Sequence, residues 1–293
     1  MSNIWLVVWL SYSAARKLTS RQLNANLRRA LKQSEGKRVV NSRMLKKIFL
    51  ESKDTRVLKE VFEHFVARSK SGDVQVNLFL NRCISEKFNK NADSRREVLK
   101  YFKGLAGKGD SFGLKGLIVG VKDSVASNRE VALAGLRELA EQNNRHVLSG
   151  LVIGVKDKVE SNRRIALMGL RELAERGDAR TLNGLLVGVK DFDVINRGLA
   201  VWGLQNLAVD GDARTLPGLM IGVRDSNANN RGRALEGLKN LARKGDARVL
   251  RGLMIGLKDS DNYNRIEALI GLELLAEKGN FEAKKALNGL KKK

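Results

Sequence analysis

The sequence of 293 residues is poor in the residue types that build cross-links and metal centres. It contains one cysteine, Cys83, and two histidines, His64 and His146. A single cysteine excludes an intramolecular disulfide framework, and so few soft ligands argue against zinc or another transition metal. We therefore expect no metal and no cofactor. The expected compartment is reducing, either the cytoplasm or, for a DNA-binding protein, the nucleoid or nucleus.

Proline and aromatic residues are also scarce, which favours helices over β-structure. The chain has one proline, and aromatic residues make up 5% of it, whereas hydrophobic residues make up 43%. Alanine, leucine, glycine and valine supply most of the apolar surface, as in closely packed helices. The apolar run at residues 4–10 would reach about 10 Å as a helix, a third of a bilayer core. We interpret it as a helix covering one end of the core; the alternative is an anchor at a membrane surface.

A motif recurs every 34 residues along most of the chain. An aspartate follows a lysine or arginine, and Asn-Arg stands five and six residues after that aspartate. The sequence predicts a basic N-terminal helical cap with degenerate repeats at 1–88, continuous with an array at 89–293 in one solenoid. The six predicted repeats are 89–122, 123–156, 157–190, 191–224, 225–258 and 259–293.

Each repeat has the pattern of two helices. Asn162 is a predicted N-cap, and apolar residues then follow at helical spacing. Gly177 is predicted to end the first helix and Asp178 to cap the second. Glycines four residues apart in the second helices, such as Gly184 and Gly188, indicate a close approach of neighbouring backbones. Because such a hairpin cannot bury both helices alone, neighbouring repeats must stack into one core.

These repeats resemble HEAT repeats, in particular the short HEAT-like repeats named after phycobilisome lyases. The matching features are the aspartate with arginine six residues later, the Gly-Asp step, and Pro217 near the start of a second helix. The resemblance covers 89–293 well and 17–88 loosely. It implies an all-α, right-handed α-α superhelix whose second helices line the inner wall. Function is not implied, because the family includes lyases, adaptors and nucleic-acid binders.

The repeated acidic and basic residues are interpreted as structural pairs that hold the stack together. A guanidinium binds a carboxylate strongly and in a fixed geometry, so we expect hydrogen bonds across the turn and between neighbouring repeats. The paired residues are Asp123 and Arg129, Asp157 and Arg163, Asp191 and Arg197, Asp225 and Arg231, and Asp259 and Arg265.

Two further series of cations recur on the second helices and are candidates for binding an anion. Rows of cations at the spacing of neighbouring helices, about 8–10 Å, can follow a phosphate backbone; a solvated rim is the alternative. A third series, which is aliphatic, is assigned to packing between repeats; its members are Val119, Ile153, Val187, Ile221 and Ile255. The two cation series are Lys122, Lys156, Lys190, Arg224 and Lys258, and Arg180, Arg214 and Arg248.

Much of the net charge of +23 lies near the N-terminus, where residues 11–50 contain eleven basic residues and one acidic residue. Since this excess exceeds what solubility requires, it points to an anionic partner. The candidate contacts in this segment are Arg28, Arg29, Lys32, Lys37, Arg38, Arg43, Lys46 and Lys47.

Three functions remain open from the sequence. The first is a monomeric, non-enzymatic solenoid that binds RNA, DNA or a ribonucleoprotein through phosphate and shape contacts. The second is a scaffold for an acidic or helical protein, and an anionic membrane surface ranks below both. The third is a DNA-glycosylase-like protein, which would need a carboxylate near an aromatic residue; Trp202, Asp193 and Asp210 are the nearest candidates. No residue is assigned a catalytic role.

Overall fold

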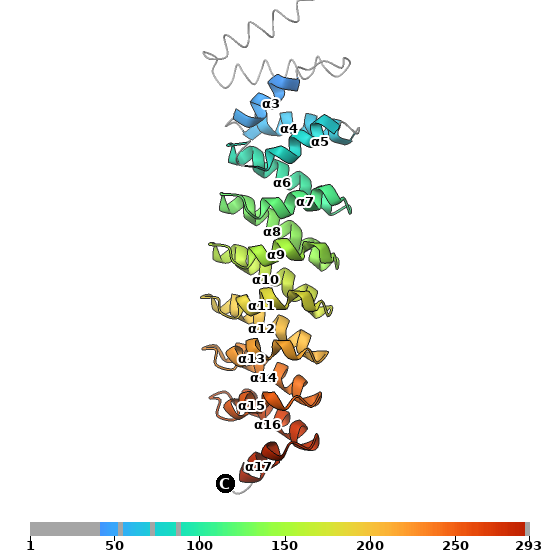
Figure 1. Cartoon of the computed structure of the whole chain (residues 1–293). Coiled ribbons are helices and arrows are strands. Elements are labelled where there is room, and N and C mark those ends of the chain that lie inside the picture. Colours follow the sequence, from blue (N-terminus) through green and yellow to red (C-terminus); the bar gives the residue numbers. More distant parts are fainter. Residues whose placement is uncertain (1–41, 52–54, 71–73, 86–88, 291–293) are drawn as a thin grey trace, which may run out of the picture. The chain divides into compact units, whose positions relative to one another are not determined.

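A computed structural model describes residues 42–51, 55–70, 74–85 and 89–290, which form helices joined by turns and contain no strand. The chain separates into two compact units, Met1–Val98 and Leu99–Lys293. The all-α repeat solenoid predicted from the period is confirmed (Figure 1). The predicted division after residue 88 stays a prediction.

The described part of the first unit is held together by phenylalanines. The rings of Phe49, Phe62, Phe65 and Phe79 lie with centroids 5.1–6.2 Å apart, in stacked, tilted and edge-on pairs. Cys83, at the end of the same helix as Phe79, is fully buried. Its burial raises the pKa of its thiol. Its helices are α3 (Ser42–Glu51), α4 (Thr55–Lys70) and α5 (Val74–Cys83), and α6 (Ala92–Ala106) contains the boundary with the second unit.

In the second unit, long first helices alternate with short second helices, stacked pair on pair (Figure 1). The first helices pack against one another, and each second helix packs most closely against the first helix of the following repeat. The first helices are α8 (Ala126–Glu141), α10 (Glu160–Glu175), α12 (Val194–Val209), α14 (Ala228–Arg243) and α16 (Asn262–Glu277). The second helices are α7 (Ser111–Gly120), α9 (Leu148–Gly154), α11 (Leu182–Gly188), α13 (Leu216–Gly222) and α15 (Leu250–Gly256), and α17 (Phe281–Leu290) follows α16.

The turn between the two helices of a repeat follows the predicted chemistry. Gly177 has a φ of +76°, a left-handed conformation that glycine adopts without strain. The Asp178 carboxylate then accepts a hydrogen bond from the backbone N–H of Arg180. The cap begins a 3₁₀ turn, Ala179–Thr181, which leads directly into α11. The second helix therefore consists of two pieces, where one helix was predicted.

The prediction that Asn162 caps the first helix is wrong. α10 begins at Glu160, and Asn162 lies buried in its first turn. The Asn162 amide donates instead to the Ala126 carbonyl of the preceding repeat, at 3.2 Å. The reason is local: the Asp157 carboxylate already accepts from the backbone N–H of Val159, which starts the helix two residues earlier. This asparagine therefore joins repeats.

The paired glycines of the second helices make room for leucine side chains. A Cβ placed on Gly184 would lie 2.4 Å from Leu170 Cδ1, and one on Gly188 would lie 2.4 Å from Leu167 Cδ2. The predicted close approach is present, but it brings a helix backbone against leucines of the preceding first helix. These leucines are fully buried and form the continuous core.

Candidate binding surface on the second helices

The repeated arginines and aspartates form a ladder from one repeat to the next. Arg197 donates from Nε and Nη2 to the two carboxylate oxygens of Asp225, at 2.7 and 3.1 Å. Its Nη1 donates to the backbone carbonyl of Asp191 in its own repeat, at 3.1 Å. The equivalent forks are Arg129 with Asp157, Arg163 with Asp191, and Arg231 with Asp259. The side chain of each arginine thus joins the aspartate of the next repeat and the backbone of its own.

The ladder is largely withdrawn from solvent and is electrostatically satisfied. Its carboxylates are 3–4% exposed and its guanidiniums 13–19% exposed. Hydrogen bonds from Arg231 lower the pKa of Asp259 to about 2, although burial opposes this shift. The last arginine, Arg265, donates to the backbone carbonyls of Asp259 and Ser260 and to the Asn262 side chain. Since these groups bind one another, they are not available to a ligand.

The series at the ends of the second helices is exposed in every described repeat. The side chains of Lys122, Lys156, Lys190, Arg224 and Lys258 all face solvent. Among the described residues, no ion pair is recorded for any of these five, and Arg224 donates only to the backbone carbonyl of Met220. These cations therefore contribute uncompensated charge.

An aliphatic side chain stands three residues before each of these cations, and the structure leaves it in contact with solvent. Val119, Val187 and Ile221 are 48%, 39% and 40% exposed; Ile153 and Ile255 are partly exposed. Packing between repeats was predicted for this series, with a ligand stripe as the alternative; about half of each exposed side chain is covered and the rest is accessible to a ligand. The buried glycines on the other side of each short helix already fill the packing role.

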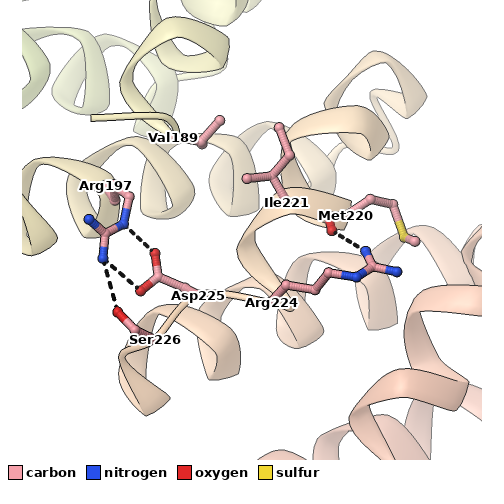
Figure 2. A pocket seen from close by; sticks show the side chains of 7 residues that line it. All are labelled: Val189, Arg197, Met220, Ile221, Arg224, Asp225 and Ser226. Carbon is pink, nitrogen blue, oxygen red and sulfur yellow. Dashed lines mark hydrogen bonds and ion pairs between the residues drawn. The ribbon is translucent and has the colours of Figure 1, made fainter. Parts of the chain in front are cut away.

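One shallow pocket between neighbouring repeats shows how the ladder and the exposed row lie side by side (Figure 2). At one side Arg197 binds Asp225 and Ser226. At the other side the Arg224 guanidinium turns toward Met220, away from the Asp225 carboxylate. A ligand at this position would meet Arg224 and Ile221.

In the second predicted row of cations, each arginine has its positive charge compensated by an aspartate of the same turn. Arg180 donates from Nε and Nη2 to the Asp178 carboxylate, at 2.9 and 2.7 Å; Arg214 and Arg248 bind Asp212 and Asp246 in the same way. The aspartate that caps the 3₁₀ turn lies two residues before each arginine. This pairing lowers the pKa of Asp178 and leaves the row with little net charge.

Most of the N-terminal candidates lie outside the described residues. These are Arg28, Arg29, Lys32, Lys37 and Arg38; Arg43 and Lys47 belong to α3, but their side chains are not described. The Lys46 ammonium lies 5.0 Å from the centroid of the Phe79 ring, a cation–π contact.

Sequence reasoning missed a cluster on the first helices. The guanidinium carbons of Arg171 and Arg233 lie 4.3 and 4.0 Å from the centroid of the Trp202 ring. The sequence offered two signals: Trp202, which the glycosylase hypothesis singled out, and Arg233, which replaces the aliphatic residue found at this position in the three preceding repeats. Asp193, a candidate for the glycosylase hypothesis, caps α12 and binds Arg164.

Within the described part of the chain, no group of three histidine, cysteine or acidic side chains could hold a metal ion. Within the same part, no helix has the length and apolar character needed to cross a membrane.

Comparison with known proteins identifies the fold alone. No protein-family model and no curated protein matches the sequence. The chain is similar to Cex1p, with 15% identity, a TM-score of 0.52, and coverage of 96% of this chain and 61% of Cex1p. It is similar to a computationally designed armadillo repeat protein for modular peptide recognition, with 16% identity, a TM-score of 0.50, and coverage of 67% and 98%. A HEAT-like repeat protein from Thermococcus onnurineus NA1 has 14% identity, a TM-score of 0.46, and coverage of 68% and 80%. The chain is an armadillo/HEAT-like α-solenoid repeat protein.

Proposed function

We propose that this protein is a non-catalytic scaffold whose second helices bind an extended acidic segment of a partner protein. The observation that carries the proposal is the exposed pair of one aliphatic residue and one cation in five consecutive repeats, such as Val187 with Lys190 and Ile221 with Arg224. We name these five pairs, from Val119/Lys122 to Ile255/Lys258, the second-helix row. The designed armadillo protein with a similar fold is described as made for peptide recognition.

The spacing of the row suits a polypeptide in extended conformation. Neighbouring helices lie about 8–10 Å apart, and an extended chain in the polyproline II conformation covers about 9 Å in the three residues of one turn, so that every third side chain faces the same side. One acidic and one apolar side chain in every three residues would therefore meet one repeat. Each exposed ion pair contributes little alone, so affinity would grow with the number of repeats occupied and with the apolar area buried.

Nucleic acid is the second candidate, and the cations of the row together with the basic segment 11–50 favour it. Phosphate contacts need the cations but not the aliphatic side chains beside them. The aliphatic half of the row is therefore what favours a protein partner. In each of the five repeats the cation of the row has an aliphatic residue three positions before it.

The test compares two labelled probes by fluorescence anisotropy: a peptide of five Leu-Glu-Ser units and a single-stranded RNA of similar length. We expect Val187→Ser with Ile221→Ser to weaken peptide binding at least tenfold. The same pair of substitutions should leave RNA binding unchanged, because serine removes apolar area and no charge. A Leu-Gln-Ser peptide serves as the uncharged control and should bind more weakly.

A matched pair of charge variants completes the design. Lys190→Gln with Arg224→Gln should weaken binding of the acidic peptide, whereas Arg180→Gln with Arg214→Gln removes equal charge from arginines already paired with aspartates. The second variant should bind as the unmodified protein does. If RNA binds, the peptide does not, and the aliphatic substitutions have no effect, the scaffold proposal is overturned in favour of nucleic acid.

A further inference from the structure

One stripe of α12 differs from the equivalent stripe of the neighbouring first helices. Ile195 and Val209 are 51% and 53% exposed, and Trp202 lies midway between them. Each is seven residues from the tryptophan, so all three lie along one side of the helix, two turns apart. In the repeats on either side the end positions are polar or charged: Ser127, Ser161 and Asn229 at the first, and Glu141, Glu175 and Arg243 at the second.

The centre of this stripe is cationic. Arg171 from α10 and Arg233 from α14 lie over the Trp202 ring, so that three consecutive first helices contribute to one stack. Burial lowers the pKa of Arg233, Glu236 opposes the shift, and the neighbouring charge of Arg171 adds to it. Two guanidiniums of like charge are thus held against one ring, and a bound anion would offset their repulsion.

The acidic group beside the stack, Glu172, is shared between two arginines, so one carboxylate serves both Arg137 and Arg171. Glu172 accepts from Arg137 Nε at 3.2 Å and lies 3.7 Å from Arg171. Buried polar atoms of α10 and α12 also lack a hydrogen-bond partner among the described residues, namely Arg171 Nε, Glu172 Oε2, Gln205 Oε1 and Asn206 Nδ2.

We propose that the stripe Ile195–Trp202–Val209 is a second docking site, which binds an acidic amphipathic helix of a partner protein. The stripe is apolar at both ends and cationic at the centre. A complementary helix carries an acidic residue facing Arg171 and Arg233, with apolar residues seven positions before and after it. Trp and Arg are the residue types that most often dominate the energy of such contacts. This site lies on the first helices and is independent of the second-helix row.

The experiment uses Trp202 as its own reporter. Trp5→Phe with Trp9→Phe leaves it as the single tryptophan of the chain. The probe is a synthetic 21-residue helical peptide with leucine at positions 4 and 18 and glutamate at position 11. We expect a saturable change in Trp202 emission. A peptide with lysine at position 11 should produce no change at the same concentration.

Four single variants locate the contact. Arg171→Gln and Arg233→Gln should each weaken binding at least tenfold, and Ile195→Ser and Val209→Ser, which change exposed side chains only, should each weaken it about threefold to tenfold. Arg251→Gln removes an exposed arginine from the second helix α15 and should have no effect. Circular dichroism verifies that each variant folds.

Three results would each overturn the docking site: no emission change at millimolar peptide, equal binding of the lysine peptide, or unchanged affinity in the Ile195 and Val209 variants. Substitutions at Val187 and Ile221 on the second-helix row should not alter this signal. Failure here therefore leaves the proposed scaffold function standing, and the converse also holds.

Discussion

The two sides of α12 differ in whether their residues recur 34 positions away in the neighbouring repeats. On one side, Asn196, Arg197 and Gly203 repeat the residues found 34 positions away and make the same contacts between repeats. On the other side, Ile195 and Trp202 have no counterpart in the neighbouring interior repeats. The comparison teaches that the solenoid is specified by the repeated side, which leaves the other side free to acquire a distinct surface.

Acid should weaken the whole ladder at once, which makes this the largest expected effect. The ladder aspartates have pKa values below the ordinary value, about 2 for Asp259. A carboxyl whose pKa is lowered on folding stabilises the protein above its unfolded pKa and loses that contribution as the pH falls toward the folded pKa. The melting temperature, followed by circular dichroism, should therefore fall between pH 4 and pH 2.

Acid should have the opposite effect on stability at Glu172, which lies outside the ladder. Burial raises the pKa of Glu172, with Arg137 opposing the shift, so protonation of Glu172 in acid should stabilise the fold slightly.

The variant Arg231→Gln tests the acid response of the ladder. It removes the fork to Asp259 and should reduce the loss of stability between pH 4 and pH 2. An acid response that is unchanged in this variant would contradict the role assigned to the ladder.

Removing one interior aspartate tests a single rung of the ladder, which is one arginine–aspartate pair between two repeats. Asp225→Ala leaves the Arg197 guanidinium, which is 19% exposed, without its carboxylate. Breaking a buried pair in this way typically costs about 3–5 kcal/mol, so we expect a loss of about 3 kcal/mol in urea denaturation. Cooperative unfolding should also be weakened, because the rung joins two repeats.

The end of the described array provides the control for that rung. Arg265 occupies the same position in its repeat, but it hydrogen-bonds only to backbone carbonyls and to Asn262. Arg265→Ala should therefore cost less than about 1.5 kcal/mol, the upper range for an ordinary hydrogen bond. Equal losses at Asp225 and Arg265 would show that the carboxylate fork adds nothing beyond backbone contacts.

The sequence predicts what depends on the period, and less of what depends on helix packing angles. The repeat length, the solenoid, the turn at Gly177 and the role of Arg197 all follow from residues 34 positions apart. The fork from Arg180 to Asp178 was not predicted: Arg180 was assigned to a row of candidate anion-binding cations, although Asp178 was expected as a cap two residues before it. The stack at Trp202 was not predicted either, because its members are 31 residues apart, an offset set by how neighbouring first helices cross.

At the paired glycines of the second helices two opposing effects on stability largely cancel. Gly188→Ala places a Cβ 2.4 Å from Leu167 Cδ2 and 2.8 Å from Ala200 Cβ, so one neighbour or the helix must move. Overpacking of this kind costs about 1–3 kcal/mol, and the better helix propensity of alanine returns about 1 kcal/mol.

The net loss should be about 0–2 kcal/mol in urea denaturation. Gly104→Ala is the matched control, since Gly104 lies in helix α6 with no atom within 4 Å of the added Cβ. It should gain about 0.5–1 kcal/mol. The same sign at both positions would mean that the second helices are not held against the leucines of the preceding first helices, and that the repeated side is looser than its contacts indicate.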